Sequence, residues 1–198
     1  MEILVKVSRE QMVENRARIL REASRLFRAR GFADVTVADV MKAAGQTHGG
    51  FYGHFASKGD LIAATVADTL GGEASAMADI DAWTDAYLSP LHRENPDQGC
   101  PMASLAGLMR HQTQEARGAM AHGLNRHIER FAAALPGDDD AERRQAAIGR
   151  WAAMVGAVVL SRAVDNPALS DELLHATRAW IATTQARVTT DQEEDARA

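Results

Sequence analysis

The segment from Thr36 to Leu61, TVADVMKAAGQTHGGFYGHFASKGDL, constrains the fold more than any other part of this 198-residue chain. Two short helical patterns are separated by an Ala-Gly pair at positions 44–45, and a Tyr-x-His-Phe cluster follows before Ser57 opens a further helix. A first helix, a turn that contains glycine and a second helix are the parts of a helix-turn-helix. The segment therefore predicts a helical unit whose second helix can enter the major groove of DNA.

Helical patterns also occupy the rest of the chain. Apolar residues recur at helical spacing from Glu10 to Arg30, and Gly31 ends that pattern. No segment shows the two-residue period of a strand, so the fold class predicted is all-α, with an N-terminal three-helix helix-turn-helix head and a larger helical body. After the second helix of the motif, the expected helices are 58 to about 78, 79–93, 101 to about 111, 114–135, 141–164 and 170–188. The expected domains are a head at 9–56, an effector-binding and dimerisation body at 57–188, and a flexible tail at 189–198.

Charge is distributed unevenly along the chain, whose formal net charge is -5. Residues 1–60 carry ten Lys and Arg against seven Asp and Glu, whereas residues 61–198 carry twelve against twenty. A mildly basic head can steer one face toward phosphate. The single cysteine, Cys100, fits a reducing compartment, and the longest apolar run, 151–160, is about half a membrane span. We therefore expect a cytoplasmic protein with no membrane segment, and no cofactor is expected.

The second helix of the motif carries the candidate DNA-reading residues. Thr47 and His48 lie at its N-terminus, the part that meets base edges, and Gln46 just before them could pair with adenine. Gly49 and Gly50 lower helix stability, which suggests that they let the backbone approach the groove closely; the alternative is that they only loosen the turn.

The flanks of the same helix carry candidate phosphate-binding residues. Tyr52 and His54 could donate to phosphate oxygens, as could Thr36 at the N-cap of the preceding helix. Lys58 adds positive charge at the start of the next helix. The alternative for Tyr52 is a half-buried ring with a hydrated hydroxyl. The neighbouring phenylalanines of the cluster are expected to be core anchors.

This segment resembles the TetR family of bacterial transcriptional regulators over about residues 12–65. The residues that carry the resemblance are Thr36, Val40, Ala44, Gly45, Thr47, Gly50, Tyr52, His54, Phe55, Ser57, Lys58 and Leu61, together with Ile19, Ala23, Phe27, Gly31 and Phe32 of the first helix. The resemblance implies an all-helical homodimer with a three-helix head and a body that binds a small effector. It also implies DNA contacts by Thr36, Thr47, His48, Tyr52, His54 and Lys58. Position 46 is usually aliphatic in the family, and the polar Gln46 departs from that pattern.

The two C-terminal helices are the candidate dimer surface. Gly149, Ala153 and Ala157 form a row of small residues that would let a partner helix approach, with Trp151 among the apolar residues around it. The last helix carries an apolar stripe that includes Trp180. The pattern alone fits an internal helix–helix contact equally well, and the resemblance favours the dimer.

The middle helices supply the candidate effector pocket. Methionine-rich linings repack easily and suit an apolar ligand, although plain hydrophobic core is the alternative for each residue. The candidate lining residues are Trp83, Tyr87, Cys100, Met102, Leu105, Met109, Met120, Leu124, Phe131 and Met154.

Cys100 is also the candidate N-cap of the helix that Pro101 begins, a position that would make its thiol reactive; the alternative is a cysteine that only packs. Metal binding is not expected, because His122 and His127 are five residues apart and do not share a helix face. We expect the histidines of the body, including His92, to lie on the surface.

The function predicted is a ligand-responsive, dimeric DNA-binding repressor that a small apolar effector releases from its operator. Alternatives are a thiol-based electrophile or redox sensor that acts through Cys100, an all-helical enzyme, and a non-specific architectural DNA binder. An enzyme would need a nucleophile–base pair or a metal cluster, and an architectural protein would bind operator and random duplex equally.

Overall fold

The computed structural model describes residues 8–72 and 79–195, with side chains through Thr183. Every regular element within these ranges is a helix, so the all-α prediction is confirmed. The chain divides into two compact units, which we call the head unit, residues 1–72 with 105–121, and the body unit, residues 73–104 with 122–198.

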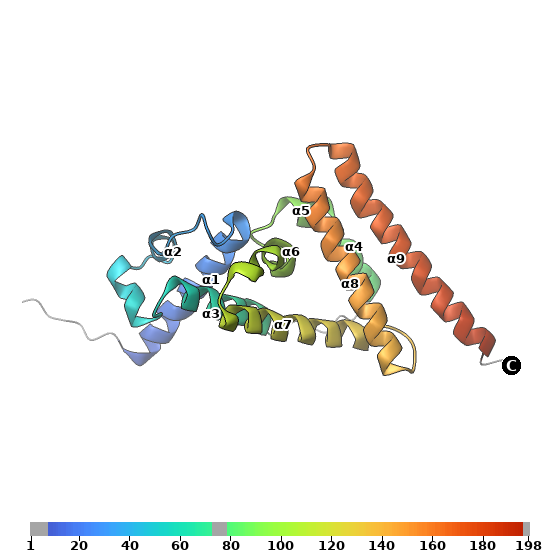
Figure 1. Cartoon of the computed structure of the whole chain (residues 1–198), viewed down its shortest axis with the longest axis horizontal. Coiled ribbons are helices and arrows are strands. Elements are labelled where there is room, and N and C mark those ends of the chain that lie inside the picture. The colour runs from blue at the N-terminus through green and yellow to red at the C-terminus, as the bar shows by residue number, and fades with distance from the viewer. Residues whose placement is uncertain (1–7, 73–78, 196–198) are drawn as a thin grey trace, which may run out of the picture. The chain divides into compact units, whose positions relative to one another are not determined.

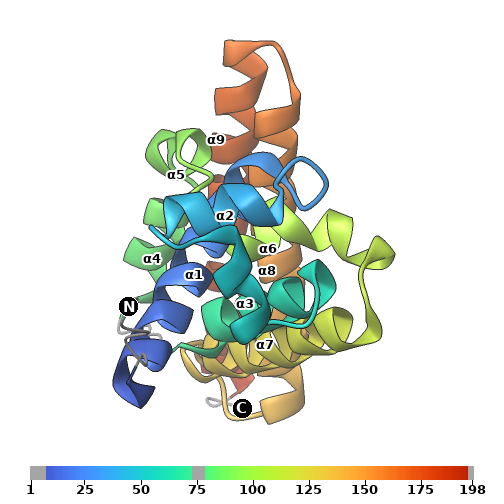
Figure 2. The same ribbon diagram turned by 90° about the vertical axis from the view of Figure 1, so that its left-hand side faces the viewer.

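The head unit is built on the helix α1. Its core joins Ile19 and Phe27 of α1 to Val40 and Leu61 of the following helices, all at most 1% exposed. In this unit α1 contacts both α2 and α3 (Figure 2). Its elements are α1 (Arg9–Arg30), α2 (Val37–Ala43), the 3-10 helix η1 (His48–Gly53), α3 (Lys58–Gly71), the 3-10 helix η2 (Ala106–His111) and the first turns of α7 (Gln114–Ala133).

Short polar side chains begin the helices of the head unit. Thr36 forms a capping box with Asp39, Thr47 accepts a hydrogen bond from the Gly50 N–H at 3.3 Å, and Ser57 accepts one from the Asp60 N–H at 3.1 Å. Each cap satisfies an N–H group that the helix leaves without an intrahelical partner. The predicted N-cap Thr36 is therefore confirmed, and Thr47 and Ser57 cap the next two helices.

Two glycines in the head unit adopt backbone conformations that other residues avoid. Gly31 ends α1 with φ 77°, and Gly45 makes the turn after α2 with φ 66°. Glycine lacks the Cβ atom that makes this left-handed region costly for other residues. The turn of the helix-turn-helix therefore depends on Gly45.

The head unit differs from the sequence prediction at two places. The second helix of the motif is a 3-10 helix, because Gly49, Gly50 and Gly53 make an α-helix of six residues unfavourable. The helix α3 ends at Gly71, and the expected continuation to residue 78 lies outside the described residues. In addition, α3 packs on α1 and belongs to the same compact unit.

The body unit is dominated by an antiparallel pair of long helices, α8 and α9 (Figure 1). The connection between them is fixed by the Ser170 hydroxyl, which donates to the Ser161 carbonyl at 2.7 Å. The Arg93 guanidinium binds the Asp171 carboxylate at 2.6 Å and so attaches α5 to the start of α9. The helices of the unit are α4 (Ile80–Tyr87), α5 (Pro90–Glu94), α6 (Pro101–Leu105), the rest of α7, α8 (Asp140–Ala163) and α9 (Pro167–Asp195).

Helix boundaries in the body unit differ from the sequence prediction at two places. The single helix expected over 79–93 is broken after Tyr87, because Ser89 caps a new helix whose first residue is Pro90. The last helix begins at Pro167 and continues to Asp195, past the boundary predicted at residue 188, because no Pro or Gly interrupts the polar run there. Residues 196–198 of the expected tail lie outside the described residues.

Among the described residues, one helix has the length and apolar character that crossing a membrane would require. It is α8, and 39% of its most apolar window is buried within the protein. Core helices of soluble proteins meet the same criteria, so this is weak support for a membrane segment.

Candidate nucleic-acid interface

The 3-10 helix η1 separates polar from apolar side chains. Phe51 and Phe55 are 1% and 2% exposed, and their ring centroids lie 5.7 Å apart, as expected of core anchors. Tyr52 is 70% exposed, and its ring meets the edge of His48 at 6.5 Å. Thr47 is exposed as well. Two buried rings therefore hold η1 in place while its polar residues face solvent.

The glycines of η1 are not required by packing inside the head unit. A Cβ atom added at Gly49 or Gly53 would meet no other atom within 4 Å, and one at Gly50 would make only ordinary contacts, the nearest at 3.5 Å. None of the three has positive φ. The space beside these glycines is open, which agrees with the interpretation that they admit a partner from outside.

The residues expected to flank the interface lie at helix starts. The Thr36 hydroxyl donates to the Asp39 carboxylate at 2.7 Å, and the hydrogen bonds from Thr36 hold the pKa of Asp39 below its usual range. The Lys58 ammonium donates to the Ala33 carbonyl at 3.5 Å from the first residue of α3. Thr36 is thus exposed but already engaged in capping, and Lys58 is half-buried with one long hydrogen bond.

The end of η1 is held by Arg16 of α1. Its guanidinium donates to the His54 carbonyl at 3.4 Å and lies over the Phe55 ring, 4.4 Å from the centroid. Burial lowers the pKa of His54, and the positive charge of Arg16 lowers it further. His54 is therefore neutral near pH 7 and can contact phosphate only through a neutral N–H group.

Gln46 turns toward α1. Its side-chain amide donates to the Asn15 side-chain oxygen at 3.2 Å, and its backbone N–H donates to the Met41 carbonyl at 2.8 Å. The side chain is half-buried. Gln46, whose position is usually aliphatic in the TetR family, therefore has a polar partner on α1.

The structure brings some of the predicted effector residues together in the body unit. Trp83 stacks on Tyr87 at 5.2 Å and meets the edge of Phe131 at 5.8 Å. Two residues outside the prediction complete this aromatic cluster, because Trp151 lies 5.0 Å from Tyr87 and 3.9 Å from His127. The aromatic cluster comprises Trp83, Tyr87, His127, Phe131 and Trp151.

Two sequence interpretations are corrected by this cluster. Trp151 is 4% exposed and packs inside the body unit, so it is not part of a dimer surface. His127 is half-buried with its Nε2 atom covered, and its ring lies 3.9 Å from Trp151, so it is not a surface residue. Burial lowers its pKa to about 4, and the charge of Arg130 adds to that effect. The contact between His127 on α7 and Trp151 on α8 could be found only from the packing of the two helices, which periodicity does not specify.

Cys100 has neighbours that the sequence prediction did not identify. Its backbone N–H donates to Nε2 of His92 at 2.9 Å, while Nδ1 of His92 donates to the Tyr87 carbonyl at 2.7 Å. Burial lowers the pKa of His92, and the two hydrogen bonds suit its neutral form. The residue is half-buried, so the predicted surface position was wrong. Arg162 donates to the His92 carbonyl at 2.7 Å.

The Tyr87 hydroxyl is buried beside the Cys100 thiol. It makes no hydrogen bond of normal geometry with the described residues. Burial raises the pKa of Tyr87 far above its usual range, and the adjacent thiol raises it further. The Tyr87 hydroxyl is therefore a neutral donor in the interior of the body unit.

The remaining predicted effector residues are core residues. Met102, Met154 and the half-buried Leu124 lie in the body unit, whereas Leu105, Met109 and Met120 fall in the head unit. Apart from Leu124 these are at most 8% exposed. The ten residues are therefore divided between the two units.

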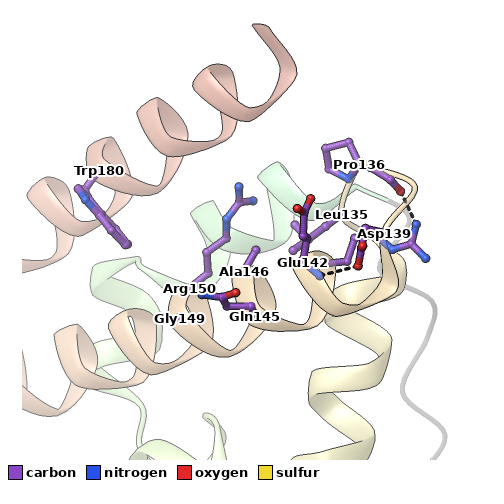
Figure 3. A pocket seen from close by; sticks show the side chains of 11 residues that line it. Leu135, Pro136, Asp139, Glu142, Gln145, Ala146, Gly149, Arg150 and Trp180 are labelled. Atoms are coloured by element: carbon purple, nitrogen blue, oxygen red, sulfur yellow. Dashed lines mark hydrogen bonds between the residues drawn. The ribbon is translucent and has the colours of Figure 1, made fainter. Parts of the chain in front are cut away.

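A cavity of about 460 Å³ lies in the body unit, beside the start of α8. In Figure 3 the side chain of Arg150 extends from α8 toward this space, and Trp180 reaches it from α9. The small residues Ala146 and Gly149 line it as well, and Arg150 is only 5% exposed. None of the ten predicted effector residues lines this cavity.

Exposed apolar side chains gather on the same two helices. Of the large apolar residues that are exposed in the described part of the chain, those on α8 and α9 are Ile148, Val159, Leu160, Leu169 and Trp180. Val158 and Leu174, at most 3% exposed, point into the unit instead. The α8–α9 pair thus has an internal face and an exposed apolar face. Within the described ranges, no group of three or more His, Cys, Asp or Glu side chains could hold a metal ion.

Comparison with known proteins agrees with this geometry. Residues 19–65 match the family of bacterial regulatory proteins named tetR, so the resemblance to the TetR family is confirmed. Over 61 residues the chain is 41% identical to the HTH-type transcriptional regulator TtgR of Pseudomonas putida, a match that covers 31% of this chain and 29% of that protein. The matched part is therefore less than a third of the relative's length.

Solved structures resemble most of the chain in their fold. The reduced form of E. coli NemR superimposes with a TM-score of 0.68 at 20% identity, covering 85% of this chain and 95% of that one. A TetR transcriptional regulator from Legionella pneumophila gives 0.66 at 20% identity, covering 92% and 100%. At this identity the likeness shows the all-helical fold. The family that the comparisons indicate consists of transcriptional regulators, which are not enzymes.

Proposed function

We propose that this chain is a DNA-binding transcriptional regulator that works as a homodimer and is released from its operator by a small effector. The observation that carries the proposal is the exposed face of η1, where Thr47, His48 and Tyr52 surround glycines with open space beside them. A helix-turn-helix that reads a major groove needs such a face.

Within this function the exposed residues divide into two groups. Thr47 and His48 read base edges from the N-terminus of η1. Tyr52 and Lys58 hold phosphates, and Thr36 and His54 add contacts with the sugar–phosphate backbone. The open space at Gly49 and Gly50 lets the DNA approach the backbone of η1. Residues of the first group set preference, and residues of the second set affinity.

The α8–α9 pair forms the dimer surface. A second copy of the chain covers Leu160, Leu169 and Trp180, because exposed apolar residues of this size on neighbouring helices are typical of an interface. The partner also packs against the cavity beside Gly149, where small side chains permit close approach. Two heads related by a two-fold axis can then occupy successive major grooves.

Leu160→Asp tests this surface. A charge at a covered apolar position should yield monomers in light scattering and weaken operator binding by at least about 100-fold, since one head loses the help of the other. Arg144→Asp, at an exposed position on the same helix, is the control and should stay dimeric. A dimeric Leu160→Asp protein would place the interface elsewhere.

The effector binds in the body unit at the aromatic cluster. Two buried polar atoms there, the Tyr87 hydroxyl and Nε2 of His127, make no normal hydrogen bond with the described residues and are available to a ligand. The rings favour an apolar ligand that carries one or two polar groups. Such a ligand dissociates the operator complex only if it binds the DNA-incompetent conformation more tightly.

The decisive experiment selects genomic DNA fragments with the purified chain and measures their affinity by fluorescence anisotropy. A regulator binds a few fragments at least about 1,000-fold more tightly than random duplex at the same salt concentration. A panel of aromatic and aliphatic metabolites is then screened for release of DNA and for quenching of tryptophan fluorescence. Equal affinity for all duplexes would contradict the proposal. As such a regulator the protein works in the cytoplasm.

A further inference from the structure

The recognition helix η1 has little stability of its own. Three of its six residues are glycines, and it is a 3-10 helix, whose hydrogen bonds have poorer geometry than those of an α-helix. Besides the buried ring of Phe51, its position relative to α1 therefore depends on contacts at its ends.

Both ends of η1 are held by neighbouring residues of α1. Before the helix, Gln46 donates to the Asn15 side-chain oxygen at 3.2 Å. After it, the Arg16 guanidinium donates to the His54 carbonyl at 3.4 Å and covers the Phe55 ring at 4.4 Å. Asn15 and Arg16 are consecutive, so one turn of α1 contacts the entry and the exit of the recognition helix.

Asn15 is buried although it is polar, with 9% of its surface exposed. Its side-chain oxygen accepts from Gln46 and also from the Gln11 amide at 3.1 Å. Buried amides are costly without hydrogen-bond partners, so the bond from the half-buried Gln46 amide helps to satisfy the buried Asn15 side chain. A base pair in the groove would have to compete with this bond for the Gln46 amide.

We propose that Asn15, Arg16 and Gln46 form a polar clamp that sets the angle at which η1 meets DNA, and that Gln46 is a positioning residue and not a base reader. The proposal rests on the proposed DNA-binding function. The glycines of η1 make the helix less rigid, and the hydrogen bonds of the clamp compensate for this loss. Gln46 therefore acts on DNA only through the position of Thr47 and His48.

A double-mutant cycle tests the Asn15–Gln46 half of the clamp. Asn15→Leu takes the partner from the half-buried Gln46 amide, and Gln46→Leu leaves the buried Asn15 oxygen with only the Gln11 amide. Each should weaken operator binding by roughly tenfold. The double variant removes both amides and should bind within about threefold of the parent protein. Additive losses in the double variant would overturn the clamp.

The base preference of Gln46→Leu separates positioning from reading. Affinities are measured for operator fragments with one base pair changed at a time, below the melting temperature of every variant. A positioning residue weakens binding to all fragments by the same factor. A loss of preference confined to one base pair, with unchanged melting temperature, would make Gln46 a base reader.

Arg16→Lys tests the other half, because lysine keeps the charge but not the planar group that covers Phe55. We expect several-fold weaker binding with an unchanged dependence on salt, since no phosphate contact is lost. Arg18→Lys, at an exposed position on the same helix, is the control and should change neither. Equal affinity of Arg16→Lys and the parent protein would refute this half.

Hydrogen exchange tests the clamp without DNA. In the free protein, the Gly50 and His54 amides donate to the carbonyls of Thr47 and Phe51. Both amides should exchange faster in Gln46→Leu and in Arg16→Lys than in the parent protein. In the double variant Asn15→Leu/Gln46→Leu they should exchange at the parent rate. Unchanged exchange would overturn the clamp whether or not the chain binds DNA. Failure of the parent protein to bind any fragment, with faster exchange in these variants, would instead refute only the proposed function.

Discussion

The head and body units place their polar groups in opposite ways. In the head, Thr47 and Tyr52 face solvent while Phe51 is buried beneath them. In the body, the Tyr87 hydroxyl and the His127 ring lie among tryptophan and phenylalanine rings. The head therefore presents its candidate functional groups on a surface that is already exposed to solvent. In the body, a ligand must displace packed side chains to reach the Tyr87 hydroxyl and the His127 ring.

This difference assigns different roles to the two units. A surface held by caps and buried rings can bind DNA without rearranging, so its affinity depends on the exposed residues. A packed interior with unsatisfied polar atoms stores free energy that a ligand can recover by rearranging it. We therefore expect changes of exposed residues in the head to alter DNA binding with little effect on stability. Changes in the aromatic cluster should alter stability with little direct effect on DNA binding.

A matched pair of aromatic substitutions tests the comparison with the largest expected effect. Trp151→Ala removes a ring that is 4% exposed and should lower the free energy of unfolding by about 3–5 kcal/mol. Tyr52→Ala removes a ring that is 70% exposed and should change it by less than about 0.5 kcal/mol while weakening operator binding. Denaturant unfolding and anisotropy measure the two effects. Similar stability of both variants would end the distinction between the units.

The buried histidine gives the next largest effect, which depends on pH. Because burial lowers the pKa of His127 to about 4, the unfolded chain binds the proton more readily between pH 6.5 and 4. This contribution to stability is complete above pH 6.5 and is lost as the pH falls toward 4, by at most about 3 kcal/mol.

Variants of two histidines on α7 isolate this effect. His127→Gln should reduce the fall in melting temperature between pH 7 and pH 5, because no proton is then taken up at this position on unfolding. His122→Gln changes an exposed residue of the same helix and should leave the fall as it is. An identical pH dependence in both variants would mean that His127 is not responsible.

The head could be predicted from the sequence because its signals are local. An N-cap such as Thr36 or Thr47 acts on residues two or three positions away, and a turn glycine acts at its own position. What local signals did not give was the 3-10 form of η1 and the partner of Gln46, which is 31 residues distant on α1.

The body could be predicted only as helices. Periodicity indicates that Trp83 and Trp151 lie on the apolar faces of their helices, but it does not indicate which helices pack against each other. Along the chain, His127 lies five residues from His122 on the same helix, whereas its neighbour in space is Trp151. The aromatic cluster joins three helices, and this information lies in the packing of the chain and not in any one segment.

Within the head, phosphate contacts and base contacts should separate. Lys58→Ala should weaken binding to every fragment about five- to tenfold and lower the slope of log affinity against log salt by about one. Thr47→Ser keeps the hydroxyl that caps η1 and removes only a methyl group, so it should alter preference among operators at constant stability. Uniform losses in both variants, measured over the same fragments, would contradict the two roles.

Two glycines that flank the same turn give the smallest and most specific effects. Gly45 has φ 66°, so Gly45→Ala should destabilise the head by about 1–2 kcal/mol. Gly49 has open space beside it and no positive φ, so Gly49→Ala should leave stability unchanged or raise it by up to about 1 kcal/mol. The DNA, however, would meet the new methyl group, and operator affinity should fall severalfold. Denaturant unfolding measures the stability of both variants, and fluorescence anisotropy measures their operator affinity. Should Gly49→Ala bind as tightly as the parent protein, the open space at η1 does not receive DNA, and the glycines serve only the turn.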